Sequence, residues 1–332
     1  MDQKSGAEAD WILTAQLGDG AIAHYTDKVA IRPYLANYAA LGLVRATQVT
    51  GDSRYLQSAW RWLFWYRDHE NAGGYVTDYS IQNTEEVSTG TMDSTDAYAG
   101  TFLYAAWAAW NTGHDTAALT ALRPGITGAI RAIESTLDTD GLTWATPTYH
   151  VKYLMDEAEV YVGLRSAAAL TSTLTDKATA SRMTLEAKRL KSAVGALWNT
   201  TTISYDWAVH DTGAHAVTNW SVFYPDALEQ MWAVAFGLTD LKSESITTRF
   251  GALHPYWDAP AATWTANGQT QTVEYWPVAG WAYAVAGSPA QASLGAASIQ
   301  SAALAASRAW PYNPGIAGQL IALTSGGPSL PS

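Results

Sequence analysis

Two groups of carboxylates each stand just ahead of an apolar helical stretch. Asp93 and Asp96 precede residues 97–110, which carry no charge. Asp156 and Glu159 are three residues apart, so on a helix their side chains share one face. Two like charges on a partly buried face raise the pKa of one acid, which then holds a proton at neutral pH. These groups therefore predict general acid and base chemistry.

Each of these acids also has a structural explanation. Asp93 is of a type that favours the N-cap of a helix. Acids in a first helical turn, such as Asp156 and Asp226, compensate the helix dipole. Glu274 stands apart from other charges, just before Tyr275-Trp276-Pro277. We keep five candidates for catalysis, which are Asp96, Glu159, Asp156, Asp93 and Glu274.

The aromatic residues have an unusual balance. The chain of 332 residues contains 16 Trp and 18 Tyr but only 5 Phe. A hydrophobic core can be filled by Leu and Phe, whose side chains have no N–H or O–H group that needs a hydrogen-bond partner. Trp and Tyr rings stack on the C–H faces of sugars, so the excess indicates a carbohydrate partner. The substrate-binding candidates, mostly at presumed helix starts or in loops, are Tyr34, Tyr98, Trp144, Tyr149, His150, Trp220, Tyr224, Asp226, Trp276 and Trp310.

Acids and aromatic rings together fit the cleavage of a glycosidic bond. One carboxylic acid protonates the leaving oxygen, and a second carboxylate activates water or attacks the sugar. We expect Glu159 or Asp156 to be the acid and Asp96 to be the base or a sugar-binding partner. The separation of the two groups sets the stereochemistry, at about 6.5–9.5 Å for inversion and about 5–5.5 Å for retention. We expect inversion.

Composition excludes several other kinds of partner. The formal net charge is −11, from 30 Asp and Glu against 19 Lys and Arg, whereas a nucleic-acid partner demands a basic face. The chain has no Cys, which removes disulfides and thiol catalysis. No apolar run reaches the roughly 18 to 20 residues of a membrane helix. We therefore expect neither nucleic acid nor membrane as a partner.

Two short motifs superficially suggest a ligand site, but neither supports a metal or a cofactor. His210 and His215 flank Asp211, but their spacing does not place them on one helix face, so an ordinary loop is favoured over a metal site. The segment Gly18-Asp19-Gly20 follows a helical stretch and no βαβ unit surrounds it, so we reject a dinucleotide site.

Two kinds of helical stretch alternate along the chain. Residues 53–68 and 181–197 are amphipathic and charged, whereas 33–44, 97–110 and 276–287 are apolar on every side. A helix that is apolar all round is enclosed by others. Pairing the two kinds predicts an all-α fold, an (α/α)6 barrel of six helical hairpins, with short β-hairpins or loops at the rim. An open α-solenoid is the alternative, but its repeats would be more regular.

The barrel is expected to form one domain over residues 1–324. Residues 325–332 are rich in Gly, Pro and Ser, which indicates a flexible tail. If the inner helices run parallel, their starts converge at one end. Carboxylates, Trp and Tyr then meet in one cleft, toward which the helix dipoles point.

This pattern resembles the six-hairpin glycosidases over nearly the whole chain. Locally, Asp93-Ser94-Thr95-Asp96-Ala97-Tyr98-Ala99 is similar to the Asp-rich helix start of glycoside hydrolase family 8, where such an Asp contacts the sugar at the cleavage point. The spacing of the Asp residues differs, and the Glu-Gly-x-Gly-Tyr loop of that family has no counterpart here. The resemblance implies a hydrolase acting on a polysaccharide or oligosaccharide.

Two other functions stay open. A polysaccharide lyase could use Tyr149 and His150 to abstract a proton, although its anionic substrate would need cationic residues. A non-catalytic barrel could bind glycans with the aromatic residues alone. The chain start has no apolar segment of a signal peptide. A mature secreted chain would look the same, so we expect a secreted or periplasmic bacterial monomer, with the cytoplasm as the alternative.

Overall fold

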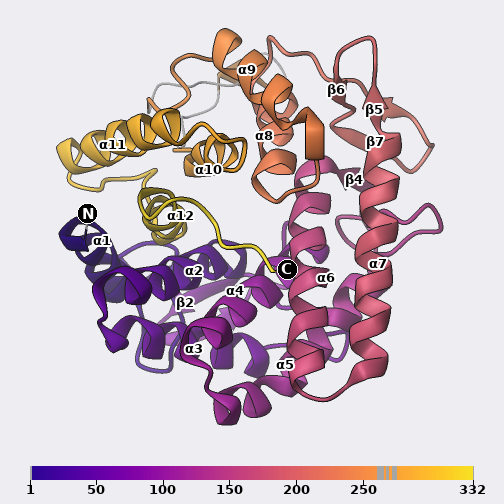
Figure 1. Cartoon of the computed structure of the whole chain (residues 1–332). Coiled ribbons are helices and arrows are strands. Elements are labelled where there is room, and N and C mark those ends of the chain that lie inside the picture. Colours follow the sequence, from indigo (N-terminus) through magenta and orange to yellow (C-terminus); the bar gives the residue numbers. More distant parts are fainter. Residues whose placement is uncertain (1, 260–264, 267–268, 271–274, 332) are drawn as a thin grey trace.

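The chain is mostly helical. A computed structural model describes residues 2–259, 265–266, 269–270 and 275–331. The described residues form twelve α-helices (Figure 1), which are α1 (Asp2–Ala15), α2 (Pro33–Thr50), α3 (Ser53–Asp68), α4 (Asp96–Gly113), α5 (Thr116–Thr136), α6 (Leu154–Thr173), α7 (Lys177–Ala196), α8 (Leu228–Ala235), α9 (Ser243–Leu253), α10 (Pro277–Val285), α11 (Pro289–Ala305) and α12 (Pro314–Thr324). The expectation of an all-α fold is confirmed.

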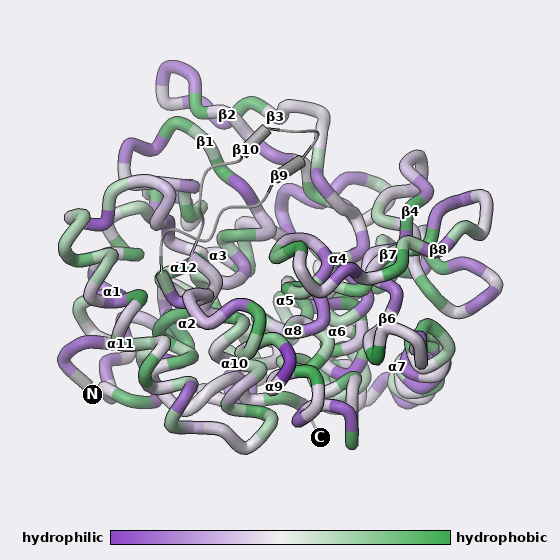
Figure 2. The backbone as a smooth tube through the Cα atoms, turned by 90° about the horizontal axis from the view of Figure 1, so that it is seen from above, coloured by the Kyte–Doolittle hydropathy of each residue, from purple (hydrophilic) through white to green (hydrophobic). Residues whose placement is uncertain are grey.

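The even-numbered helices contact one another in sequence. Contacts run from α2 to α4, then to α6, α8, α10 and α12, and α12 in turn contacts α2. An open solenoid would instead keep its first and last helices apart. The odd-numbered helices pack against this set, and α1, α7 and α11 lie toward the periphery in Figure 2. The amphipathic α7 buries Met183, Ala187, Leu190 and Val194, whereas most of α4 is buried.

Glycines allow the even-numbered helices to approach closely. A Cβ atom on Gly42 of α2 would lie 2.2 Å from the Cα atom of Gly318 in α12. A Cβ atom on Gly163 of α6 would lie 2.5 Å from the Cα atom of Gly100 in α4. These backbones therefore touch directly, and no larger residue fits at either crossing without displacing a helix.

Small antiparallel strands come just before several even-numbered helices. One sheet has the order β1-β2-β3 and another the order β4-β7-β8, with Ala30 opposite Ser80 and Lys152 opposite Val209. The strands are β1 (Ala30–Ile31), β2 (Tyr79–Gln82), β3 (Glu85–Ser88), β4 (Val151–Tyr153), β5 (Trp198–Asn199), β6 (Ser204–Tyr205), β7 (Ala208–His210), β8 (His215–Ala216), β9 (Thr265–Ala266) and β10 (Gln269–Thr270). The hairpin β2–β3 was not expected from the sequence.

The C-terminal segment lies against the helices. The hydroxyl of Tyr104 in α4 donates a hydrogen bond to the carbonyl oxygen of Ser329 at 2.6 Å, and Leu330 packs against the core. None of the helices in the described part of the chain is both long and apolar enough to cross a membrane.

Candidate functional site

A cavity of about 840 Å³ opens where the chain enters α4, α6 and α8. Its walls come from the loops before these helices and from the first turns of α6 and α8. The lining residues are Tyr75, Gly90, Thr91, Met92, Asp93, Ser94, Ala145, Thr146, Pro147, Thr148, Tyr149, Tyr153, Met155, Asp156, Trp207, Tyr224, Pro225 and Glu229. Three helix starts therefore meet at this cavity, whereas the sequence predicts that the starts of all the inner helices converge.

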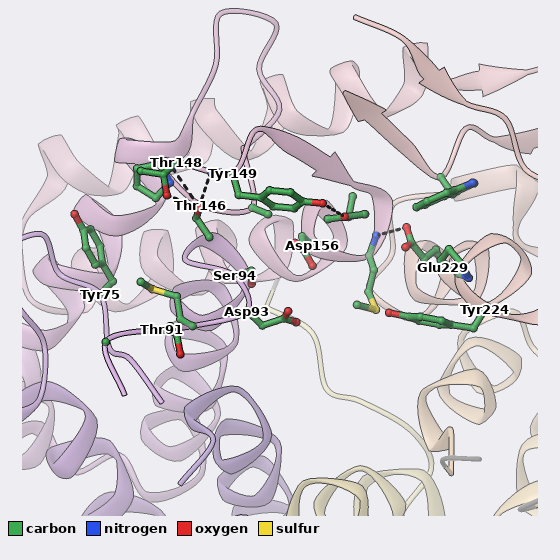
Figure 3. Close-up of a pocket in the computed structure, with 18 residues that line it drawn as sticks. Tyr75, Thr91, Asp93, Ser94, Thr146, Thr148, Tyr149, Asp156, Tyr224 and Glu229 are labelled. Carbon is green, nitrogen blue, oxygen red and sulfur yellow. Dashed lines mark hydrogen bonds between the residues drawn. The ribbon is translucent and has the colours of Figure 1, made fainter. Parts of the chain in front are cut away.

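Three carboxylates line this cavity. Asp93 precedes α4 and is exposed, Asp156 lies in the first turn of α6 and Glu229 in that of α8. Asp156 is 5% exposed and Glu229 is 2% exposed. Figure 3 shows the three groups around the same space. The cavity thus brings acids together from three separate helix starts.

The surroundings of Asp156 favour its protonated form. Burial raises the pKa of the Asp156 carboxyl well above its ordinary value, and the nearby carboxylates add to this rise. The contributing carboxylates are Asp96, Glu159, Glu229 and Asp93. An acid that keeps its proton near neutral pH can donate it to a leaving group.

Glu229 is held differently. Burial raises the pKa of the Glu229 carboxyl, but its Oε2 accepts a hydrogen bond from the main-chain amide of Met155 at 3.2 Å, which favours the charged form. Glu229 therefore differs from Asp156 in having a main-chain hydrogen-bond donor for its charged form.

The sequence singled out Asp226, one turn before Glu229. In the structure the Oδ1 atom of Asp226 accepts a hydrogen bond from the amide of Asn219 at 2.7 Å, and Asp226 does not line the cavity. The spacing of three residues between these acids, ahead of the apolar run 231–236, was the signal that could have pointed to Glu229.

Asp96 lies beneath the cavity lining, fully buried at the start of α4. The Oγ1 atom of Thr143 donates to Asp96 Oδ2 at 2.7 Å, and the amide of Thr143 donates to Glu157 Oε1 at 2.8 Å. Burial raises the pKa of Asp96 to about 7. Thr143 thus links two buried acids to the loop that forms one wall of the cavity.

Glu159 is also fully buried and outside the lining. Its Oε1 atom accepts hydrogen bonds from the hydroxyl of Tyr34 at 2.7 Å, from the hydroxyl of Tyr38 and from Trp232 Nε1 at 3.0 Å. Burial raises the pKa of Glu159 to about 7 in spite of these donors. Asp96 and Glu159 therefore form a buried acidic layer that acts on Asp156 through charge.

Aromatic rings join the helix starts. Tyr224 stacks on Trp276, with ring centroids 5.3 Å apart, and Tyr34 stacks on Tyr98 at 5.8 Å. Among the predicted sugar-binding residues, Tyr149 and Tyr224 line the cavity. Tyr75, Tyr153 and Trp207 also line it, and none of the three is among the predicted sugar-binding residues.

Other predicted binding residues have structural contacts elsewhere. The Tyr98 hydroxyl donates to Asp78 at 3.0 Å, Lys152 lies 3.9 Å from the ring centroid of Trp144, and His150 Nε2 contacts the Pro147 carbonyl at 3.0 Å. Tyr98 is buried in the interior, whereas the half-buried Trp144 and the exposed His150 both lie outside the cavity lining.

The remaining candidates are dispersed. Trp220 is buried and donates to the Thr202 carbonyl at 3.0 Å. Trp310 is 56% exposed and does not line the cavity. Glu274 lies outside the described residues. Within the described ranges no group of three or more His, Asp or Glu side chains could hold a metal ion.

Solved structures share this fold, whereas no family model matches the chain and a search of curated proteins finds no match. The GH63 mannosylglycerate hydrolase of Thermus thermophilus superposes with a TM-score of 0.65 at 12% identity, covering 96% of this chain and 99% of that chain. A β-1,3-1,4-glucanase from Paenibacillus sp. X4 gives 0.63 at 15% identity, covering 99% and 92%. An uncharacterized conserved protein, also from Thermus thermophilus, gives 0.64 at 13%, covering 97% and 99%. The chain therefore shares a helical fold with these solved structures, two of them glycoside hydrolases, over at least 96% of its length.

Proposed function

We propose that the chain is a glycosidase, built as an (α/α)6 barrel, that hydrolyses an oligosaccharide or polysaccharide. The observation that carries this proposal is the cavity in which Asp156 and Glu229 meet among Tyr and Trp side chains at converging helix starts. The fold that the chain shares with glycoside hydrolases supports the proposal. The similarity of residues 93–99 to the helix start of family 8 belongs to it as well.

The two buried acids take complementary roles in this proposal. Asp156 gives its proton to the glycosidic oxygen as the bond from that oxygen to the anomeric carbon breaks. Water adds its oxygen to the anomeric carbon and loses a proton to Glu229, whose charged form the Met155 amide stabilises. Asp93 faces the same cavity and binds sugar hydroxyls. Net inversion follows from attack on the face opposite the leaving group.

A lyase acting on an anionic glycan fits the cavity less well. Among the residues that line it there is no Lys, Arg or His to neutralise a uronate. Tyr149 is available in the lining, but His150 is turned to the Pro147 carbonyl. A non-catalytic glycan-binding barrel would need only the aromatic rings. That function would not account for the buried pair of acids, Asp156 and Glu229.

The proposed function is tested with a panel of polysaccharides and a reducing-end assay. The intact chain should release reducing ends, and Asp156→Asn and Glu229→Gln should not. Proton NMR of the first product shows the anomer, and the inverted anomer is expected. Product that absorbs as an unsaturated uronate would instead show a lyase. Tight glycan binding without product in long incubations would show a binding protein.

A further inference from the structure

Tyr75 lines the cavity from the loop between α3 and β2, and hydrogen bonds hold the main chain of this loop. Asn71 Oδ1 accepts hydrogen bonds from the amides of Gly73 at 2.8 Å and Tyr75 at 3.2 Å, and the Asn71 amide donates to the Tyr75 carbonyl at 3.0 Å. Arg131 of α5 donates to the Ala72 carbonyl at 2.9 Å. The main chain of residues 71–75 is therefore held by hydrogen bonds up to and including Tyr75.

Two glycines leave the space that this loop needs. Gly74 has φ +86°, and a Cβ atom there would lie 2.0 Å from the carbonyl oxygen of Gly128 in α5. A Cβ atom on Gly73 would lie 2.3 Å from the Tyr75 ring. Only glycine at both positions allows the loop to seat on α5 and the ring to take its place.

Tyr75 lies at the opposite end of the cavity from Tyr224. Figure 3 shows Tyr75 at one end and Tyr224 at the other, with Asp93 and Asp156 between them and Glu229 beside Tyr224. Tyr224 is backed by Trp276 in a parallel stack with an interplanar angle of 20°. Aromatic faces therefore flank the acids on both sides, whereas a site that takes only a chain end needs them on one side.

The charge of the cavity restricts the glycan further. Among the described residues that line the cavity there is no Lys, Arg or His, and the charged groups among them are carboxylates. Two of these are buried acids, Asp156 and Glu229, whose environment disfavours an additional negative charge. A uronate or sulfate group on the sugar would therefore have no partner, whereas an uncharged sugar leaves no charge unpaired.

We infer that the site binds an uncharged glycan chain along its length, with sugar units on Tyr75 and on Tyr224, so that cleavage at Asp156 and Glu229 is internal. The internal cleavage rests on the proposed glycosidase function, while the binding of the chain does not. Tyr75 acts here as a specificity-determining residue that holds the chain on the far side of the cleavage point.

Binding is measured first, by affinity electrophoresis of the full chain carrying Glu229→Gln. The gels contain barley β-1,3-1,4-glucan, glucomannan or soluble starch as neutral polymers, and the polyuronates polygalacturonate or alginate as charged ones. Retardation by at least one neutral polymer and by neither charged polymer is expected. Adding Tyr75→Ala or Tyr224→Ala should weaken binding about 2- to 10-fold each, because each removes one stacked sugar. Tyr256→Ala is the matched control, since Tyr256 is 77% exposed and does not line the cavity.

The products of the unmodified chain are then analysed on the polymer that binds. Early release of mixed oligosaccharides with a rapid fall in viscosity is expected. Release of a single monosaccharide at constant viscosity would overturn internal cleavage and leave the glycosidase function intact. Retardation without any product would overturn the glycosidase function and leave the binding mode intact. Retardation by a charged polymer, no retardation by the neutral ones, or an unchanged affinity with Tyr75→Ala would overturn the binding mode.

Discussion

The main-chain amide of Met155 donates a hydrogen bond to Oε2 of Glu229 across 3.2 Å. This bond joins the first turn of α6 to the first turn of α8, two segments more than 70 residues apart in the sequence. Asp156 is the next residue after Met155, so the same contact that holds Glu229 brings the two acids together. The geometry of the pair thus depends on how α6 and α8 pack.

Removing either acid of the pair should abolish hydrolysis without unfolding the chain. We expect Asp156→Asn and Glu229→Gln to lower kcat/KM on a cleaved polysaccharide at least about 100-fold, the usual contribution of general acid or base catalysis. Aryl glycosides with a good leaving group should retain more activity with Asp156→Asn than with Glu229→Gln. Asp226→Asn, one turn away and outside the lining, is the control. Equal losses in all three variants would contradict the assignment.

The buried acidic layer should set the high-pH limit of activity. Asp156 must be protonated to act, so activity falls as pH rises through its raised pKa. The Asp96 carboxylate contributes to that rise, so Asp96→Asn should lower the pKa of Asp156 and move the high-pH limb to lower pH. The measurement is kcat/KM against pH. Asp240→Asn, at an exposed site, should leave the profile in place.

Stability should fall with rising pH because of Glu70. Burial raises the pKa of Glu70 in the folded chain to about 9, against an ordinary value of 4.5. Between these values the folded state binds more protons than the unfolded state, so the free energy of unfolding decreases as pH rises. Glu70→Gln should reduce the loss between about pH 5 and pH 8 in urea denaturation. An identical loss in both proteins would show that Glu70 does not cause it.

The contact between α4 and α6 should tolerate no methyl group. We expect Gly163→Ala to destabilise the fold by about 1–3 kcal/mol, since its Cβ atom would overlap the backbone of Gly100. Gly195→Ala in α7 is a matched control, because nothing lies within 4 Å of its added Cβ atom. That change should be neutral or stabilise by up to about 1 kcal/mol through helix propensity. Thermal or urea unfolding of both variants measures the difference.

The sequence predicted the helical architecture better than the site. Apolar helices alternate with amphipathic ones, and this pattern alone indicates which helices are enclosed, as α4 and α7 show. The pattern also predicted that the inner helix starts converge if those helices run parallel, and three of the starts meet at the cavity. Acids at those starts could be found by type, but whether an acid lines the cavity or lies beneath it depends on helix rotation.

Depth along the helix, as well as rotation, explains the differences among the acids at the starts of α6 and α8. Asp156 and Glu159 share a face by spacing, yet Glu159 lies one turn deeper, where three donors surround it. Asp226 and Glu229 have the same spacing, and there the second acid lines the cavity. Tyr75 could not be found, since its position comes from a loop whose path depends on the α5 backbone at Gly128.

The direct contact between α2 and α12 has a consequence for how the chain acquires its shape. Gly42 and Gly318 are separated by most of the sequence, so this contact cannot form on the ribosome until the last helix has emerged. The residues that line the cavity, between positions 75 and 229, are made much earlier. Before α12 has emerged, the nascent chain therefore holds its acids and aromatic rings among helices in which α2 and α10 lack their α12 neighbour. Chains truncated before α12 should be sensitive to proteases and prone to associate through the exposed faces of α2 and α10.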